Sequence, residues 1–179
     1  VNGNLVVSET LAVGRSGTAS VCTVPGTCYD VTVDGGSYQS EVTWSFADEF
    51  TSEVAPFSGN WCTPCPLSYY ADGTNTCELC DAGYYGDTTG LTTSTCTGKC
   101  DAGYYGSADS IQTTSTCTGV CADGIASLPG ATVCSSCPPG YYRVGTICDL
   151  CDAGYFGATA GLTTSTCTGL CDAGYYGDT

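Results

Sequence analysis

Cysteine is the residue in this chain whose number and spacing are best suited to chemistry. The 179 residues include 16 cysteines and no histidine. Cysteines at such a density close disulfide bonds in secreted proteins, bind zinc as thiolates, or carry out redox chemistry. Because histidine is absent, the usual general base of a hydrolytic triad is missing. No pair of acids is placed around a recognisable pocket, so we predict that the chain is not an enzyme.

Part of the cysteine spacing fits a zinc site. Two groups of four cysteines have the paired Cys-x-x-Cys spacing of a four-thiolate zinc module: Cys62, Cys65, Cys77 and Cys80, and Cys134, Cys137, Cys148 and Cys151. Other pairs, such as Cys96 and Cys100, have a Cys-x-x-x-Cys spacing in Thr-Gly sequence. No βαβ pattern surrounds any pair, as a redox motif of the thioredoxin type requires. We therefore predict disulfides, with zinc as the weaker alternative.

Acidic residues are a second set of candidate ligands. Carboxylate oxygens are what calcium prefers, and aspartates recur on the repeats described below at Asp81, Asp87, Asp101, Asp109, Asp152 and Asp172. No stretch matches a known calcium loop. We expect solvated carboxylates that keep the protein soluble and no bound cofactor, with calcium left as an alternative.

The charge balance restricts the partners. Eighteen acidic and three basic residues give a net charge of −15. Nucleic acids and anionic membranes are bound mainly through Lys and Arg, so neither is expected as a partner. No apolar run is long enough for a membrane-spanning helix. The first residue is Val1, and the chain stops inside a repeat. We expect a piece of a longer secreted, extracellular protein.

Most of the chain consists of tandem repeats. The long kind reads CDAGYYG, or CDAGYFG at Cys151, followed by a Thr-rich stretch and TTSTCTGxC. It starts at Cys80, Cys100 and Cys151, and again at Cys171. The short kind starts at Cys65 and Cys137, and residues 121–137 form a degenerate unit without the aromatic pair. Glycines predict tight turns, and the Thr runs favour short extended segments. We predict an elongated array of short, disulfide-rich β-hairpins over residues 62–179, with almost no helix.

Residues 1–61 differ and predict a small β-rich module. Alternating apolar residues in 29–33 and 41–46 flank the turn signal Asp34-Gly35-Gly36-Ser37, which predicts a β-hairpin over 29–46. Residues 5–7 and 11–13 are candidates for further strands. A free strand within residues 1–13 would be able to pair with a neighbouring subunit. Cys22 and Cys28 flank Pro25-Gly26 and suit a small disulfide loop.

Two pairing schemes fit the remaining cysteines. In one, each repeat closes on itself: 65–77, 80–96, 100–117, 121–134, 137–148 and 151–167, which leaves Cys62 and Cys171 without partners. In the other, pairs interlock: 62–77, 65–80, 96–117, 100–121, 134–148 and 137–151. This scheme leaves over only Cys167 and Cys171, whose partners would lie beyond the chain end. We favour the interlocked scheme because it leaves no unpaired thiol in the middle of the chain, although spacing alone does not fix connectivity.

Aromatic pairs and hydroxyl-rich runs are the remaining candidate contact residues. The pairs include Tyr84/Tyr85, Tyr104/Tyr105, Tyr141/Tyr142 and Tyr155/Phe156. We expect one ring of each pair to cover a disulfide and pack between repeats, while the other faces outward toward a subunit or a glycan. No Asn-x-Ser/Thr sequon is present, but the Thr-rich runs at 92–95 and 163–166 are candidates for O-glycans.

The motif Cys-x-x-Gly-x-Tyr followed by a closely spaced cysteine pair resembles known extracellular repeats. It is similar to the cysteine-rich repeats of tumour-necrosis-factor receptors, and more so to the ephrin-receptor-like repeat of large extracellular proteins. The matching segments are Cys65–Cys80, Cys80–Cys100, Cys100–Cys121, Cys137–Cys151 and Cys151–Cys171. The receptor resemblance implies the interlocked pairing. The sequences of the repeats also resemble repeats in surface proteins of algae and other protists, and in proteins of tubular flagellar hairs, the mastigonemes.

These observations leave two classes of function. The first is a structural subunit of an extracellular filament, flagellar hair or surface coat, which self-assembles. The second is a receptor-like or adhesion ectodomain that binds an extracellular protein or glycan. A secreted inhibitor or toxin is a weaker third class, for which the repeats are too regular.

Overall fold

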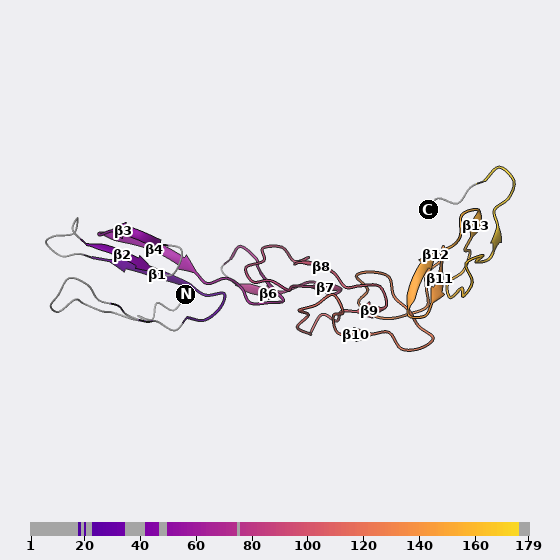
Figure 1. The fold of residues 1–179 in the computed structure, drawn as a ribbon, viewed down its shortest axis with the longest axis horizontal. Coiled ribbons are helices and arrows are strands. Elements are labelled where there is room, and N and C mark those ends of the chain that lie inside the picture. Colours follow the sequence, from indigo (N-terminus) through magenta and orange to yellow (C-terminus); the bar gives the residue numbers. More distant parts are fainter. Residues whose placement is uncertain are drawn as a thin grey trace. The chain divides into compact units, whose positions relative to one another are not determined.

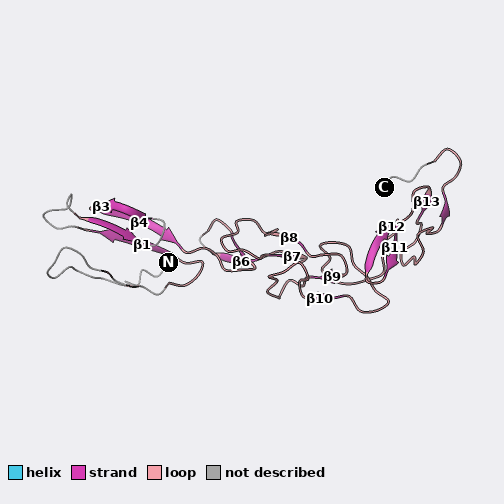
Figure 2. Ribbon diagram, viewed as in Figure 1, coloured by secondary structure: helices cyan, strands magenta, loops and turns pink. Residues whose placement is uncertain are grey.

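The computed structural model describes Thr18, Ser20 and residues 23–34, 42–46, 50–74 and 76–175. These residues contain 14 short β-strands and no helix (Figures 1 and 2). Every one of these strands lies in a two-stranded antiparallel pair, and seven disulfides join the described cysteines in pairs, with Cys171 left over. The predicted class of small disulfide-rich β-hairpins is confirmed. The chain divides into two compact units, Val1–Thr63 and Pro64–Thr179, called below the N-terminal module and the repeat region.

The N-terminal module has four described strands: β1 (Cys28–Val33), β2 (Thr43–Phe46), β3 (Phe50–Val54) and β4 (Phe57–Cys62). The two segments predicted as strands are strands, but the predicted hairpin between them is wrong. β1 pairs with β4 and β2 pairs with β3, because Cys28 lies directly opposite Cys62 and their disulfide joins β1 to β4. Alternation predicts a strand but does not choose its partner. The predicted turn at 35–37, the candidate strands within 1–13 and Cys22 lie outside the described residues.

Aromatic rings connect the two strand pairs of the N-terminal module. The ring centroid of Trp44 in β2 lies 4.7 Å from that of Phe57 in β4, and Phe46 meets Trp61 edge-on at 4.9 Å. Tyr29 in β1 lies 6.1 Å from Trp61. Contacts of this geometry add to the hydrophobic gain of burying the rings. Within the described part of the module, one disulfide and a small aromatic cluster therefore hold the strands together.

The repeat region contains six closed repeats, each bounded by its own disulfide. Repeats 1 to 6 are closed by Cys65–Cys77, Cys80–Cys96, Cys100–Cys117, Cys121–Cys134, Cys137–Cys148 and Cys151–Cys167. Five contain a hairpin: β5 (Tyr69–Ala71) with β6 (Cys77–Leu79), β7 (Tyr84–Tyr85) with β8 (Gly98–Lys99), β9 (Tyr104–Tyr105) with β10 (Gly119–Val120), β11 (Tyr141–Val144) with β12 (Ile147–Leu150), and β13 (Tyr155–Phe156) with β14 (Gly169–Leu170). Repeat 4 has only the single bridge between Ala126 and Ser135.

The fourth residue of every repeat, counted from its first cysteine, has left-handed backbone geometry. These residues have φ between +68° and +88°: Ser68, Gly83, Gly103, Gly124, Gly140 and Gly154. Glycine adopts this region without steric cost, which explains its recurrence here. Ser68 is the exception, and its buried hydroxyl donates to the carbonyl of Gln112 at 2.6 Å and accepts from the Gln112 amide at 2.5 Å. These bonds tie repeat 1 to repeat 3.

Neighbouring repeats are joined by backbone hydrogen bonds that recur along the region. At all five junctions the seventh residue of one repeat donates its N–H to a carbonyl of the next over 2.7 to 3.1 Å: Ala71 to Leu91, Gly86 to Gln112, Gly106 to Ala131, Ser127 to Thr146, and Arg143 to Leu162. In a second recurrent bond, the first cysteine of a repeat donates its N–H to the carbonyl of the fourth residue of the repeat before it. Cys80 donates to Ser68 in this way, and Cys100 donates to Gly83. Successive repeats therefore bind through the main chain.

The junction between repeats 4 and 5 keeps the seventh-residue bond, but among the described residues its first cysteine, Cys137, makes no bond to the carbonyl of the preceding fourth residue, Gly124. The hairpin tip of repeat 5 reaches back, so that Ser127 donates to Thr146 at 3.1 Å and Cys148 donates to Ser127 at 3.3 Å. A small buried cluster of Ala126, Cys137 and Cys148 lies here, with Leu128 and Tyr141 packed against it. Side-chain burial thus supplements the hydrogen bonds where the recurrent pattern is incomplete.

Candidate functional site

Disulfides are the first group of predicted site residues, and the structure contradicts the favoured interlocked scheme. Each repeat closes on itself, with Cα–Cα distances between 5.5 and 5.8 Å in all six. The left-handed fourth residue turns the chain back within each repeat, which brings that repeat's own cysteines together at the base of its loop. The predictions 62–77, 65–80, 96–117, 100–121, 134–148 and 137–151 are therefore wrong.

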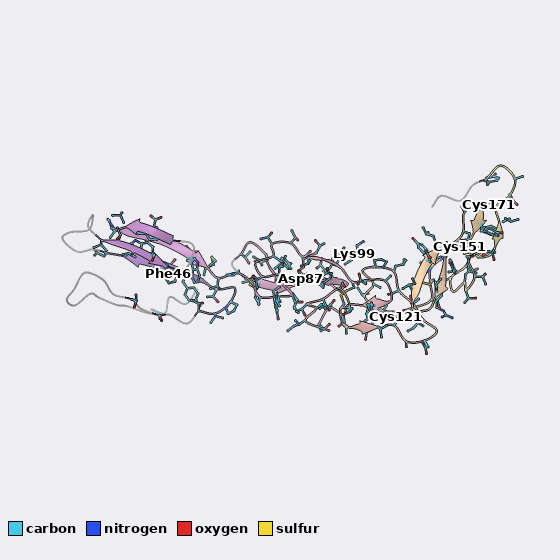
Figure 3. The ribbon with its side chains drawn as sticks, in the orientation of Figure 1. Phe46, Asp87, Lys99, Cys121, Cys151 and Cys171 are labelled. Carbon is cyan, nitrogen blue, oxygen red and sulfur yellow. A yellow bond between two sulfur atoms is a disulfide. The ribbon has the colours of Figure 1, made fainter. Side chains whose placement is uncertain are left out.

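Cys28 explains why the self-closing scheme leaves no unpaired thiol in the middle of the chain. Cys62 pairs with Cys28, so the predicted Cys22–Cys28 loop is also wrong. Cys167 pairs with Cys151 rather than with a residue beyond the chain end. Cys171, labelled in Figure 3, carries a free thiol. It donates its N–H to the carbonyl of Gly154, as the first cysteine of a repeat does.

The disulfides also exclude the two zinc modules considered above. Every cysteine of both groups is paired with another, so no thiolate is left to bind a metal. Among the described residues, no three His, Cys, Asp or Glu side chains are grouped as a metal site would require. The predicted calcium alternative gains no support from the carboxylate positions.

The aromatic pairs lie half-buried on the hairpins. Tyr84, Tyr85, Tyr104, Tyr105, Tyr141, Tyr142 and Tyr155 are all partly buried, and Phe156 is exposed. The first ring of repeat 5, Tyr141, packs against the cluster that contains its disulfide, as predicted. In the three long repeats the second ring is partly buried at Tyr85 and Tyr105 and exposed at Phe156. It lies beside the glycine directly across the hairpin, in the pairs Tyr85/Gly98, Tyr105/Gly119 and Phe156/Gly169. An aromatic ring beside a strand glycine covers backbone that the glycine leaves exposed.

A clasp between aspartate and serine closes each long repeat, and the sequence alone did not predict it. The hydroxyls of Ser94, Ser115 and Ser165 donate to Asp81, Asp101 and Asp152 over 2.6 to 2.7 Å. In return, each aspartate amide donates to the same serine's carbonyl at 2.8 Å. The signal available in the sequence was that Asp and Ser recur together at fixed positions in CDAG and TTST.

The Thr-rich run of each long repeat forms a turn, which corrects the predicted extended segment. The amides of Cys96, Cys117 and Cys167 donate at 2.9 Å to the carbonyls of Thr93, Thr114 and Thr164, three residues earlier. The same cysteines have φ between +46° and +48°. The clasp and the disulfide therefore outweigh the strand preference of threonine.

Asp72 has a strongly lowered pKa. The Thr74 hydroxyl donates to it at 2.6 Å, the Thr74 amide at 2.8 Å and the Thr76 hydroxyl at 2.9 Å. These bonds favour the charged carboxylate and lower the pKa of Asp72 from 3.8 to about 2. The arrangement fixes the exposed loop of repeat 1 and contains no further acid that would complete a cation site.

An open apolar groove of about 350 Å³ lies where repeats 3 and 4 meet. Its lining residues are Tyr105, Val120, Ala122, Ile125, Val133 and Cys134. Val120 and Val133 expose 59% and 67% of their surface. No histidine and no acid lines the groove, so its chemistry suits binding of an apolar group rather than acid–base catalysis.

Two further findings bear on function. Within the described part of the chain, there is no helix with the length and hydrophobicity to cross a bilayer. Comparison with models of known protein families and with curated proteins gave no match. The seven disulfides indicate an extracellular or secreted protein.

Proposed function

We propose that this chain is a structural subunit of an extracellular filament, flagellar hair or cell-surface coat. The observation that supports this role best is the recurrent main-chain bonding between successive repeats. Repeats that contact mainly their neighbours can be stacked to any number without a central core. The proposed role needs no catalytic site and no cofactor. Its partners are copies of the same chain or other extracellular proteins and glycans.

The charge of the chain makes a specific prediction for assembly. Copies with a net charge of −15 repel one another at low ionic strength. Salt screens repulsion between exposed charges, with a Debye length of about 10 Å at 0.1 M. Assembly is therefore expected to be promoted by raising the salt concentration.

Electron microscopy of the native material at low and moderate salt tests the proposal. We expect filaments or sheets with a regular subunit spacing, and their loss after reduction and alkylation of the cysteines. The alkylated sample is the control, because it keeps the sequence and removes the disulfides. Separate particles at every salt concentration would contradict the structural role.

The apolar groove favours the second class of function, a receptor-like or adhesion ectodomain. An apolar surface with few charges is where protein partners commonly bind. Val133→Asp would place a charge in this groove, whereas Val144→Asp would place one outside its lining. If the adhesion role holds, Val133→Asp abolishes binding to cells or matrix and Val144→Asp does not. Equal binding by both variants would rule out the groove as the adhesive surface.

A further inference from the structure

Three repeats share a six-residue stretch that the fold explains only in part. Residues 92–97, 113–118 and 163–168 all read Thr-Thr-Ser-Thr-Cys-Thr. The five or six residues just before this stretch differ between repeats: DTTGL, SADSIQ and ATAGL. The loops thus vary while the hydroxyl-rich stretch stays the same. The contacts of each of its side chains can therefore be compared across the three repeats.

Two of the hydroxyls in each stretch serve the fold. The serine donates to an aspartate in the clasp described above. The last threonine accepts a backbone N–H at 2.9 to 3.1 Å, as Thr97 does from Asp87, Thr118 from Ser107 and Thr168 from Ala158. A sugar on the serine would remove the proton that it donates to the aspartate, and a sugar on the last threonine would crowd the N–H that its oxygen accepts.

The threonines on either side of the serine have no such use. They are exposed in all three repeats: Thr93 and Thr95, Thr114 and Thr116, and Thr164 and Thr166. Among the described residues, the only partner of each hydroxyl is the other member of its pair, at 3.4, 2.8 and 3.5 Å respectively. The first threonine of the stretch is half-buried in one repeat, at Thr113, and exposed in the other two, at Thr92 and Thr163, so only the flanking pair is exposed in all three. Each long repeat therefore presents two outward hydroxyls on a turn fixed by the clasp and the disulfide.

We propose that these six threonines are acceptors of O-linked sugars. The sugar donor would be a nucleoside diphosphate sugar supplied in the secretory pathway, and a transferase would catalyse the reaction. Threonine Oγ1 forms a bond to the anomeric carbon, the bond from that carbon to the diphosphate oxygen breaks, and the nucleoside diphosphate leaves. The hydroxyl proton passes to a base of the transferase. This proposal requires secretion only, and it stands whether the chain is structural or adhesive.

Mass spectrometry of the protein purified from its natural source tests the proposal. Electron-transfer fragmentation keeps sugars attached and assigns them to single residues. We expect hexose, pentose or N-acetylhexosamine increments on the paired threonines and none on Ser94, Ser115, Ser165, Thr97, Thr118 or Thr168. An unglycosylated mass for the native chain would overturn the proposal, as would sugars confined to the serines and last threonines.

A matched pair of variants isolates one repeat. Thr93→Ala/Thr95→Ala removes the proposed acceptors of repeat 2, and Thr88→Ala/Thr89→Ala removes two other exposed threonines of the same repeat. Secreted from cells of the source organism, the first variant should lose all sugar from repeat 2. The second should keep it. Sugar retained on repeat 2 after the first change would refute the assignment, and an unchanged disulfide map would show that both variants fold.

Discussion

At the scale of single residues, the fold depends on the left-handed fourth position of each repeat. In repeats 1, 2, 3 and 5 its N–H and carbonyl both bond to the next repeat, as in Gly83, which donates to Gly106 and accepts from Cys100. A side chain at this position must tolerate a positive φ and must also fit beside a repeat further along the chain. These two demands can be separated by substitution.

Gly83→Ala is expected to destabilise the repeat region more than Gly154→Ala. The two glycines have φ of +83° and +84°, so an alanine suffers the same backbone strain at either position. An added Cβ at Gly83 would lie 2.2 Å from the carbonyl oxygen of Gly130, whereas Gly154 has nothing within 4 Å. Overpacking costs about 1–3 kcal/mol. We expect the free energies of unfolding of the two variants, measured in urea, to differ by this amount. Amide exchange at Cys100 and Cys171, which donate to the two glycines, reports the loss of stability next to each substitution. Equal destabilisation by the two variants would contradict the close contact at Gly83.

Ser68 is the one fourth residue whose side chain has a partner. Ser68→Ala leaves the buried Gln112 amide without its acceptor and should cost about 1–3 kcal/mol. Ser68→Gly loses the same bonds but relieves the left-handed strain, which is worth roughly 1 kcal/mol, so it should be the milder change. The measurement is amide exchange at Gln112 together with urea unfolding. A stability of Ser68→Ala equal to that of the unsubstituted protein would show that the two hydroxyl bonds contribute nothing.

At the scale of elements, the turns and their clasps decide the local structure. In the Thr run, the observed structure differs from the one that residue propensity predicts. β-Branched residues predicted an extended segment, yet Thr93–Cys96 is a turn, because the Ser94–Asp81 clasp and the Cys80–Cys96 disulfide fix both of its ends. Propensity acts on each residue alone, whereas the clasp joins residues 13 apart. The aspartate loop of repeat 1 gives a second case in which a few side-chain bonds fix an exposed segment.

The Asp72 loop should lose its order at low pH. Because the pKa of Asp72 is lowered from 3.8 to about 2 in the folded chain, its hydrogen bonds stabilise the fold above pH 3.8. That contribution declines as the pH falls toward 2. A carboxyl titration followed by NMR should give a midpoint near 2, and Thr74→Val should raise it toward 3.8. A midpoint near 3.8 in the unsubstituted protein would show that the Thr74 and Thr76 bonds do not form in solution.

At the scale of the whole molecule, the sequence predicts the class of fold better than its connections. Repeats, hairpins and the participation of the cysteines follow from local spacing, which a single sequence displays. The partner of β1 is different, because it is fixed by a disulfide whose cysteines are 34 residues apart. Assignment of Cys28 to its near neighbour Cys22 leaves Cys62 without a partner, and this favours the interlocked scheme. One wrong long-range disulfide thus leads to wrong partners in the six local disulfides.

A digest of the unreduced protein with a protease that cuts before aspartate distinguishes the two schemes. Cuts at positions such as Asp72, Asp87, Asp109, Asp123, Asp149 and Asp152 separate the cysteines into a few fragments. In the observed pairing, Cys121–Cys134 links fragment 109–122 to fragment 123–148, and Cys151–Cys167 links fragment 149–151 to fragment 152–171. The interlocked pairing makes neither link, and instead joins 123–148 to 149–151 through Cys137 and Cys151.

We expect the 149–151/152–171 product by itself and fragments 109–122 and 123–148 within one larger linked product, because Cys100–Cys117 also joins fragment 109–122 to fragment 87–100. We expect no link between 123–148 and 149–151. A reduced aliquot of the same digest is the control, because it must release every fragment singly. Recovery of the 123–148/149–151 product would refute self-closing repeats. It would also mean that a single repeat is not a complete unit, since an interlocked repeat cannot close without its neighbour. The same linkage map therefore decides whether the repeats can act as interchangeable subunits of a stacked structure.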